Sequence, residues 1–133
     1  MRVSFDSIKV GSLWDRNDLA SLWGYAGYQA LGRGHVTPRG DNKIILFVTK
    51  EKREGISEYE NTLDGDILKA DGENNHGSDR RLISAAEAGD EIHLFYRELH
   101  RDLFTYHGQV DLLEHTIHSN GPSRFMFKLW PQK

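Results

Sequence analysis

Lys43-Ile-Ile-Leu-Phe-Val-Thr-Lys50 decides the fold, because it is the only long uninterrupted apolar run in the chain. Most of its residues are β-branched or aromatic, and the run is too short for a typical helix. Asp41-Asn42 precedes it as a turn signal. We therefore expect a strand over residues 43–50 that is buried on both faces.

Unusual segments lie on both sides of this strand. Before it comes a loop rich in glycine and aromatic residues, Trp23-Gly-Tyr-Ala-Gly-Tyr28. After it comes an acidic segment, Tyr59-Glu-Asn-Thr-Leu-Asp-Gly-Asp66. We expect the strand to hold both segments at one rim of a small barrel, where they form a pocket.

Composition restricts the class of protein. The 133 residues predict one domain over 1–133, and the absence of cysteine excludes disulfides and thiolate metal sites. No segment approaches 18 apolar residues, and the N-terminus lacks the apolar region of a signal peptide. We therefore expect a cytoplasmic protein with no membrane partner.

Charge is distributed unevenly although the formal net charge is only −3. Residues 33–53 hold six basic and two acidic side chains, and residues 54–73 hold seven acidic and one basic. A basic block beside an acidic block favours a polar site over a uniformly charged face, although two solvated loops would give the same pattern.

The remaining elements are short. Helices are predicted over 18–23, capped by Asp15 or Asn17, and over 79–88, closed by Gly89. Strands are predicted over 3–10, 28–31, 66–69, 91–97, 102–110, 112–117 and 124–130. This order indicates an α+β fold, a mixed β-barrel with short capping helices.

Most catalytic and cofactor motifs are missing from the sequence. The seven histidines form no H-E-x-x-H or facial-triad spacing, and there is no G-x-S-x-G, G-x-G-x-x-G or Walker A motif. We therefore predict no metal, no cofactor and no catalytic residue. A small metal-dependent nuclease stays an alternative, because Asp64, Asp66 and Lys69 loosely imitate a nuclease motif.

The aromatic loop favours nucleic-acid binding. Aromatic faces from Trp23, Tyr25 and Tyr28 could stack on a planar base for about 1–3 kcal/mol, and a carboxylate can accept from the exocyclic amine of cytosine or adenine. Basic side chains would hold phosphates, and the candidates are Arg33, Arg39, Lys50, Arg53, Arg80 and Arg81. The competing interpretation is that Trp23 and Tyr28 close one end of the barrel.

Two families show a similar order of motifs between residues 8 and 130. Val10-Gly-Ser-Leu-Trp-Asp-Arg16, the apolar strand and the segment from Tyr59 to Asp66 resemble the SRA (SET- and RING-associated) reader of modified cytosine. Leu94-Phe-Tyr-Arg97 and Phe104-Thr-Tyr-His-Gly108, with Phe127-Lys-Leu129, are similar to the uncharacterised domain fused to restriction-type DEAD helicases.

The resemblance implies a PUA-like barrel that flips a modified base into a pocket. It makes Tyr59 one stacking face and places Asn61 where SRA domains have the aspartate that recognises the cytosine edge. It also assigns the turn that shapes the pocket to Asp64 and Asp66. The family's second stacking aromatic falls near residues 69–71, where this chain has none, so Trp23, Tyr25 or Tyr28 would replace it.

Together these features predict a non-catalytic module that binds double-stranded DNA carrying a modified base, most simply 5-methylcytosine. The resemblance implies that such a module senses modification within a restriction system, with a fused or associated nuclease or helicase. An RNA-binding PUA-like or YTH-like module and a protein-interaction module without a pocket stay open as alternatives.

Overall fold

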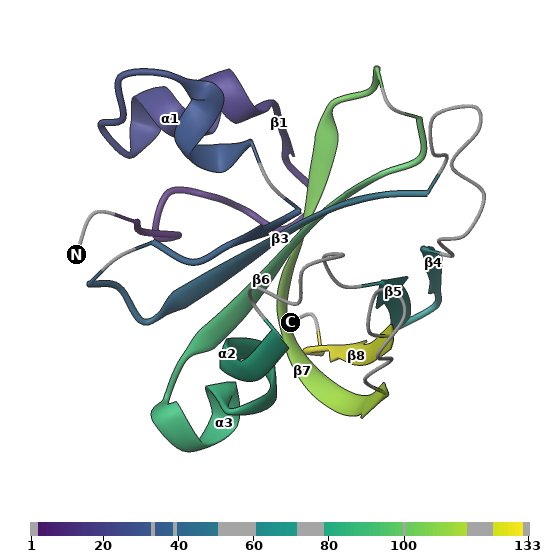
Figure 1. Cartoon of the computed structure of the whole chain (residues 1–133). Helices are drawn as coiled ribbons and strands as arrows, with labels where there is room; N and C mark the ends of the chain where they lie inside the picture. Colours follow the sequence, from purple (N-terminus) through teal and green to yellow (C-terminus); the bar gives the residue numbers. More distant parts are fainter. Residues whose placement is uncertain are drawn as a thin grey trace.

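A computed structural model describes residues 3–32, 34–38, 40–50, 61–71, 79–99, 101–116 and 124–131. Within these ranges one sheet is surrounded by short helices (Figure 1). The strands are β1 (Leu13–Trp14), β2 (His35–Val36), β3 (Lys43–Thr49), β4 (Thr62–Asp64), β5 (Ile67–Asp71), β6 (Glu91–Arg97), β7 (Phe104–Thr116) and β8 (Arg124–Leu129). The helices are α1 (Arg16–Leu22), the 3-10 helix η1 (Tyr28–Leu31), α2 (Asp79–Ile83) and α3 (Ala85–Ala88).

The sheet is mixed. Its order is β2-β3-β6-β7-β8-β5-β4, and β1 pairs with the start of β7. β3 and β6 run parallel over their whole length, and all other neighbours are antiparallel. The end strands β2 and β4 do not pair with each other in the described part of the chain. The mixed, sheet-dominated α+β fold is therefore confirmed, whereas the closed barrel is not.

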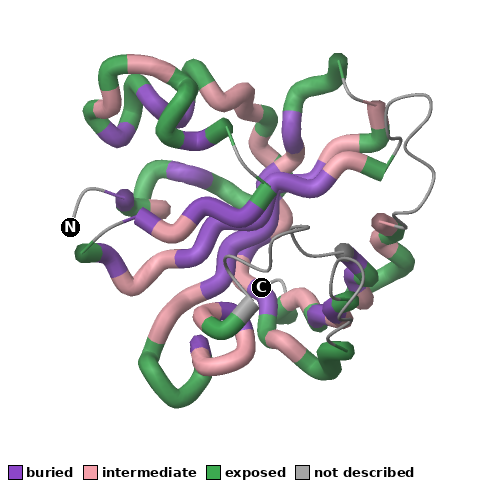
Figure 2. The backbone as a smooth tube through the Cα atoms, viewed as in Figure 1, coloured by how far each residue is buried: buried purple, intermediate pink, exposed green. Residues whose placement is uncertain are grey.

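β3 is buried on both faces, as its apolar run predicts. Ile44, Leu46 and Val48 belong to one hydrophobic cluster, while Ile45 and Phe47 belong to a second cluster on the opposite face. Figure 2 shows the neighbouring strands β3 and β6 buried along most of their length. Each buried side chain of this size contributes about 1.5–3 kcal/mol relative to an exposed one, so β3 organises both cores.

The sheet turns back on itself around the first cluster. Leu68 of β5 and Phe125 and Phe127 of β8 pack in the same cluster as Leu94 of β6, although β5 lies three strands away from β6. Leu82 of α2 and its neighbour helix α3 complete this core. The inner faces of β5 and β8 are therefore apolar, and alternation leaves their outer faces polar.

The second cluster lies under the N-terminal segment and α1. Leu19 of α1, Trp23 and Leu31 pack on Phe47 and Phe95 of the sheet. Asp15 caps α1, because its Oδ1 accepts from the backbone N of Asp18 at 2.7 Å. The second predicted helix is interrupted and becomes α2 and α3, and Gly89 ends α3 with a positive φ of 77°.

A bulge allows β7 to contribute to both cores. Leu94 pairs with Gly108 and Phe95 with Tyr106, so His107 is an extra residue on β7. Side chains alternate along a strand, so Val110 would face the same cluster as Phe104 and Tyr106 if no residue were inserted. The extra residue reverses the alternation, so Phe104 and Tyr106 face the second cluster and Val110 faces the first. Gly108 has a φ of 90°, which favours glycine at this bulge.

Some sequence predictions need correction. Residues 3–10 form turns rather than an edge strand, although Val3 and Ile8 are buried. Residues 28–31 form η1 rather than a strand. The strands predicted over 102–110 and 112–117 are one strand, β7, because pairing with β8 continues through Val110, Asp111 and Leu112 without a turn; Ile117 is outside the described residues. No helix among the described residues is long and apolar enough to span a membrane.

Candidate functional site

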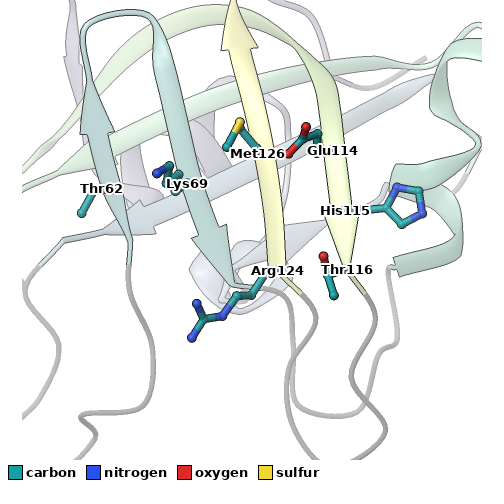
Figure 3. Close-up of a pocket in the computed structure, with 7 residues that line it drawn as sticks. All are labelled: Thr62, Lys69, Glu114, His115, Thr116, Arg124 and Met126. Atoms are coloured by element: carbon teal, nitrogen blue, oxygen red, sulfur yellow. The ribbon is translucent and has the colours of Figure 1, made fainter.

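Side chains from four neighbouring strands meet on the outer face of the sheet. Thr62 of β4 pairs with Lys69 of β5, Lys69 pairs with Met126 of β8, and Met126 pairs with Glu114 of β7. Cross-strand partners lie side by side on one face, so these four residues form a continuous row. Figure 3 shows Lys69, Met126 and Glu114 at the same level of adjacent strands. We call this row and the space over it the polar hollow.

A bulge in β7 places Glu114 in the row. Leu112 pairs with Phe127 and Glu114 with Met126, so Leu113 is the extra residue. Without this register shift Leu113 would stand opposite Met126, and Glu114 would point toward the apolar core. The bulge therefore directs a carboxylate into the hollow and leaves Leu113 about half exposed, at 49%.

The hollow has a volume of about 230 Å³ and a mixed lining. His115, Thr116 and Arg124 complete the wall formed by the cross-strand row. Drug-sized ligands occupy pockets of about 300–1,000 Å³, so this space suits a single small planar group. Lys69 donates hydrogen bonds, Glu114 accepts them, and Met126 offers a polarizable apolar surface. This combination can bind a flat molecule that carries both a donor and an acceptor edge.

The aromatic residues of the glycine loop do not line the hollow. Trp23 is only 4% exposed, packs edge-on against Phe5, and donates from Nε1 to the Ser4 carbonyl at 2.9 Å. It is a core residue, which corrects the expectation that it presents a stacking face. Tyr25 is half-buried against the second cluster, and Tyr28 of η1 is exposed. Trp23 and Tyr25 therefore pack with α1 at the second cluster, and Tyr28 lies on η1, which contacts α1.

The acidic segment is only partly described. Tyr59 lies outside the described residues, and Asn61 directs its side chain to the end of β3, where Nδ2 donates to the Thr49 carbonyl at 3.1 Å. Asp64 and Asp66 are exposed and flank Gly65, whose φ of 62° suits the tight turn between β4 and β5. None of these described side chains lines the hollow, but Asn61 directly precedes Thr62, which does.

The predicted phosphate-binding residues are dispersed. Lys50 is exposed and pairs with Glu98 at 3.5 Å, and Arg80 is exposed on α2. Arg81 is engaged internally, because it donates to the Asp41 carbonyl at 2.7 Å and pairs with Asp90 at 3.4 Å. The other three, Arg33, Arg39 and Arg53, lie outside the described residues.

Sequence reasoning missed most of the hollow. It noticed Lys69 only as part of a weak nuclease motif, and it did not consider Glu114 or Met126. Alternation in Arg124-Phe-Met-Phe-Lys-Leu129 could have assigned Met126 to the polar face, because its neighbours are buried phenylalanines. Glu114 had no such signal, since its direction depends on the bulge.

A buried polar chain lies beside the second cluster, between β6 and β7. His93 is 4% exposed; its Nδ1 contacts the Tyr106 hydroxyl at 2.6 Å and its Nε2 contacts Glu91 Oε1 at 2.9 Å. Phe5 stacks on the imidazole with centroids 3.7 Å apart. Burial lowers the pKa of His93 despite the opposing effect of Glu91, and burial raises the pKa of Tyr106 well above its usual value. This chain of contacts fastens the N-terminal segment to β6 and β7.

The described residues contain no group of three histidine, aspartate or glutamate side chains placed to hold a metal ion. Neither the described histidines nor the Asp64–Lys69 region of the nuclease alternative forms such a group. The side chains that line the hollow offer hydrogen bonding, charge and apolar contact.

The fold is that of SRA domains. The SRA domain of SUVH5 in complex with hemimethylated CG DNA superposes with a TM-score of 0.67 at 14% identity, over 100% of this chain and 96% of that one. The SUVH5 SRA domain with methylated CHH DNA gives 0.64 at 15% identity with the same coverage. The DNA modification-dependent restriction endonuclease AspBHI gives 0.58 at 15% identity, over 92% of this chain and 73% of that chain. No protein-family model matches the sequence, and no curated protein matches it significantly.

Proposed function

We propose that the protein is a reader of modified DNA that binds one base, flipped out of the duplex, in the polar hollow. The observation that carries the proposal is the fold, which follows SRA domains solved with methylated DNA along the whole chain. The hollow supports it, because it has a mixed polar and apolar lining, is open to solvent and is of a size that suits one planar ring. The module itself is non-catalytic.

We expect contacts in the hollow to offset the free-energy cost of flipping a base out of the duplex. Unpairing and unstacking a base costs a few kcal/mol, and the cost is smallest for a base that is already weakly paired. Hydrogen bonds to charged groups contribute about 1.5–3 kcal/mol each, so contacts with Lys69 and Glu114 together offset about that cost. A contact between the Met126 sulfur and an aromatic ring adds about 0.3–1.5 kcal/mol.

The same groups indicate which base edge would be bound. Glu114 accepts from an exocyclic amine, which cytosine and adenine have and thymine lacks. Lys69 donates to a ring nitrogen or carbonyl on the same edge. A modified cytosine fits this arrangement, with its substituent directed toward Met126. Such a reader would act as the sensor of a modification-dependent restriction system, together with a fused or associated nuclease or helicase.

The proposal is tested by binding titrations with matched duplexes. The duplexes carry unmodified cytosine, 5-methylcytosine, 5-hydroxymethylcytosine or N6-methyladenine at one central position, and an RNA duplex of the same sequence tests the RNA-binding alternative. We expect the wild-type chain to bind one modified cytosine duplex at least tenfold more tightly than the unmodified duplex. Equal binding of all four DNA duplexes would overturn the proposal.

Variants locate the recognition in the hollow. Thr62→Trp fills the space with a large side chain, and Glu114→Gln removes the charged acceptor while keeping the shape. Both should lose the preference for the modified duplex while retaining weak, salt-dependent binding. Lys128→Gln is the matched control, because Lys128 is an exposed cation on β8 that does not line the hollow.

A further inference from the structure

The wall of the hollow offers little apolar surface. Of the described residues that line it, only Met126 has an apolar side chain. The others are two threonines, two cations, a glutamate and a histidine, namely Thr62, Thr116, Lys69, Arg124, Glu114 and His115. A methyl group in this space would contact one apolar side chain, whereas a hydroxyl group would meet several hydrogen-bonding groups.

The polar wall continues along β7 and β8 beyond the pair of Glu114 and Met126. Thr116 pairs with Arg124 on the same two strands, two positions further along each. Side chains two positions apart on a strand face the same way, so Thr116 follows Glu114 on the face of the hollow, and Arg124 follows Met126. Figure 3 shows Thr116 and Arg124 at this second level. The carboxylate end of the hollow is therefore flanked by a threonine hydroxyl.

The orientation of the proposed base determines what this hydroxyl would meet. Glu114 accepts from the exocyclic amine, and Lys69 donates to the ring nitrogen or carbonyl of the same edge. In cytosine, carbon 5 is bonded to the carbon that carries the amine, on the side away from that ring nitrogen. A substituent on carbon 5 therefore lies at the Glu114 end of the hollow, away from Lys69. Its neighbours there are Met126, across the pair, and Thr116, along β7.

Magnitudes favour a hydroxyl over a methyl group in this place. Full burial of a group the size of a methylene raises affinity about fourfold, and an open hollow gives less. A hydrogen bond between neutral groups contributes about 2- to 12-fold, and one to a charged group about 12- to 150-fold. A threonine hydroxyl both donates and accepts, as the hydroxyl of a ligand does. Arg124 also interacts with other groups of the protein, so we assign the contact to Thr116.

We propose that the hollow selects cytosine with a hydroxyl-bearing substituent on carbon 5, of which 5-hydroxymethylcytosine is the smallest, and that Thr116 distinguishes it from 5-methylcytosine. The hydroxyl of the substituent bonds to Thr116 Oγ1, and its methylene contacts Met126. A site that binds a ligand hydroxyl disfavours the analogue that lacks it, because the polar group of the site is left without a partner. This inference rests on the proposed function for the entry of a base, and it adds the chemical class of the substituent.

The first arm of the test compares three duplexes that differ only in carrying cytosine, 5-methylcytosine or 5-hydroxymethylcytosine at one position. We expect the hydroxymethyl duplex to bind about tenfold more tightly than the methyl duplex, which is about 1.4 kcal/mol. Thr116→Val keeps the shape of the side chain and removes the hydroxyl, so the ratio should fall to about twofold or less. Thr116→Ser keeps the hydroxyl and should keep the ratio.

Thr105→Val is the matched control for this arm, because Thr105 lies on the same strand and does not line the hollow. It should leave the ratio of the two affinities at the wild-type value. Thr116 is exposed, so Thr116→Val should also leave the urea unfolding midpoint unchanged. A lost ratio at an unchanged midpoint distinguishes recognition of the substituent from a structural role.

The second arm uses free nucleosides and no DNA. Methyl resonances of Met126 and Thr116 are followed by NMR while 5-hydroxymethyl- or 5-methyl-deoxycytidine is added. We expect both resonances to shift along one saturating curve, at lower concentrations of the hydroxymethyl nucleoside, while the methyl resonance of Thr105 stays in place. Shifts that require equal or lower concentrations of the methyl nucleoside would overturn the inference.

The two arms separate failure of this inference from failure of the proposed function. If both modified duplexes bind more tightly than cytosine but the methyl duplex binds at least as tightly as the hydroxymethyl duplex, the reader survives and the inference is rejected. A hydroxymethyl preference that Thr116→Val retains also rejects it. If no duplex is preferred but the hydroxymethyl nucleoside is, the DNA reader fails and the ligand class survives. If neither duplexes nor nucleosides are distinguished, both fail.

Discussion

Replacing Trp23 distinguishes a core residue from a base-stacking residue. Its side chain is 4% exposed, contacts Phe5, and donates one hydrogen bond to the Ser4 carbonyl. Truncating a buried tryptophan to alanine costs about 3–5 kcal/mol, which is a large part of the 5–15 kcal/mol typical of a domain. Trp23→Phe keeps most of the buried area and loses the hydrogen bond, so we expect a loss of about 1–2 kcal/mol.

The assay is urea unfolding followed by circular dichroism. With a slope of about 2 kcal/mol per M, Trp23→Ala should lower the midpoint by about 2 M and Trp23→Phe by less than about 1 M. Tyr28→Ala is the matched control from the same loop, because Tyr28 is 49% exposed and its loss should change stability by no more than about 0.5 kcal/mol. A Trp23→Ala chain that unfolds at the wild-type midpoint but no longer discriminates modified DNA would refute this reasoning.

Three further predictions follow from local structure. Asp15→Ala removes the cap of α1 and should lower stability by about 0.5–2 kcal/mol in urea unfolding, whereas Asp15→Asn should be nearly neutral. Gly108→Ala places a side chain at a φ of 90° and should cost about 1–3 kcal/mol in the same assay; an unchanged midpoint contradicts the bulge. His93 has a lowered pKa, mainly through burial, so the unfolded chain takes up a proton near pH 6.5 that the folded chain does not. Stability should therefore be full above about pH 6.5 and fall as the pH drops below that value, and His93→Gln should flatten that fall in thermal unfolding curves.

Elements whose structure depends on local composition could be predicted from the sequence. The five consecutive apolar residues 44–48 predicted a strand buried on both faces, because a strand exposed on one face would leave some of these side chains in solvent. Asp15 was one of the two predicted caps of α1, and Gly89 was predicted to close the second helix, since their chemistry is local. The order of motifs also predicted the SRA-like fold.

The elements that depend on pairing could not be predicted. The parallel pairing of β3 with β6 joins residues almost fifty positions apart, and nothing in either strand specifies its partner. The bulges at His107 and Leu113 reverse which side chains face the core, and the sequence signals neither. Trp23 was assigned to a pocket because glycines surround it, but those glycines let the chain bend so that the ring enters the core.

The candidate site differs from the pocket that the sequence predicted. That pocket was expected between the glycine loop and the acidic segment, and of the described residues in these two segments only Thr62 lines the hollow. Its other wall comes from β7 and β8, which lie more than forty residues further along the chain. Only the sheet order brings Glu114 and Met126 to Lys69, and short-range patterns carry no information on that order.

Entry of an extruded base into the hollow can be followed by the fluorescence of 2-aminopurine placed next to the modified base, because this reporter brightens when its neighbour leaves the stack. We expect a rise in emission when the wild-type chain binds the modified duplex, and no rise with Thr62→Trp at concentrations where that variant is also bound. Saturated binding of the wild-type chain with unchanged emission would contradict it.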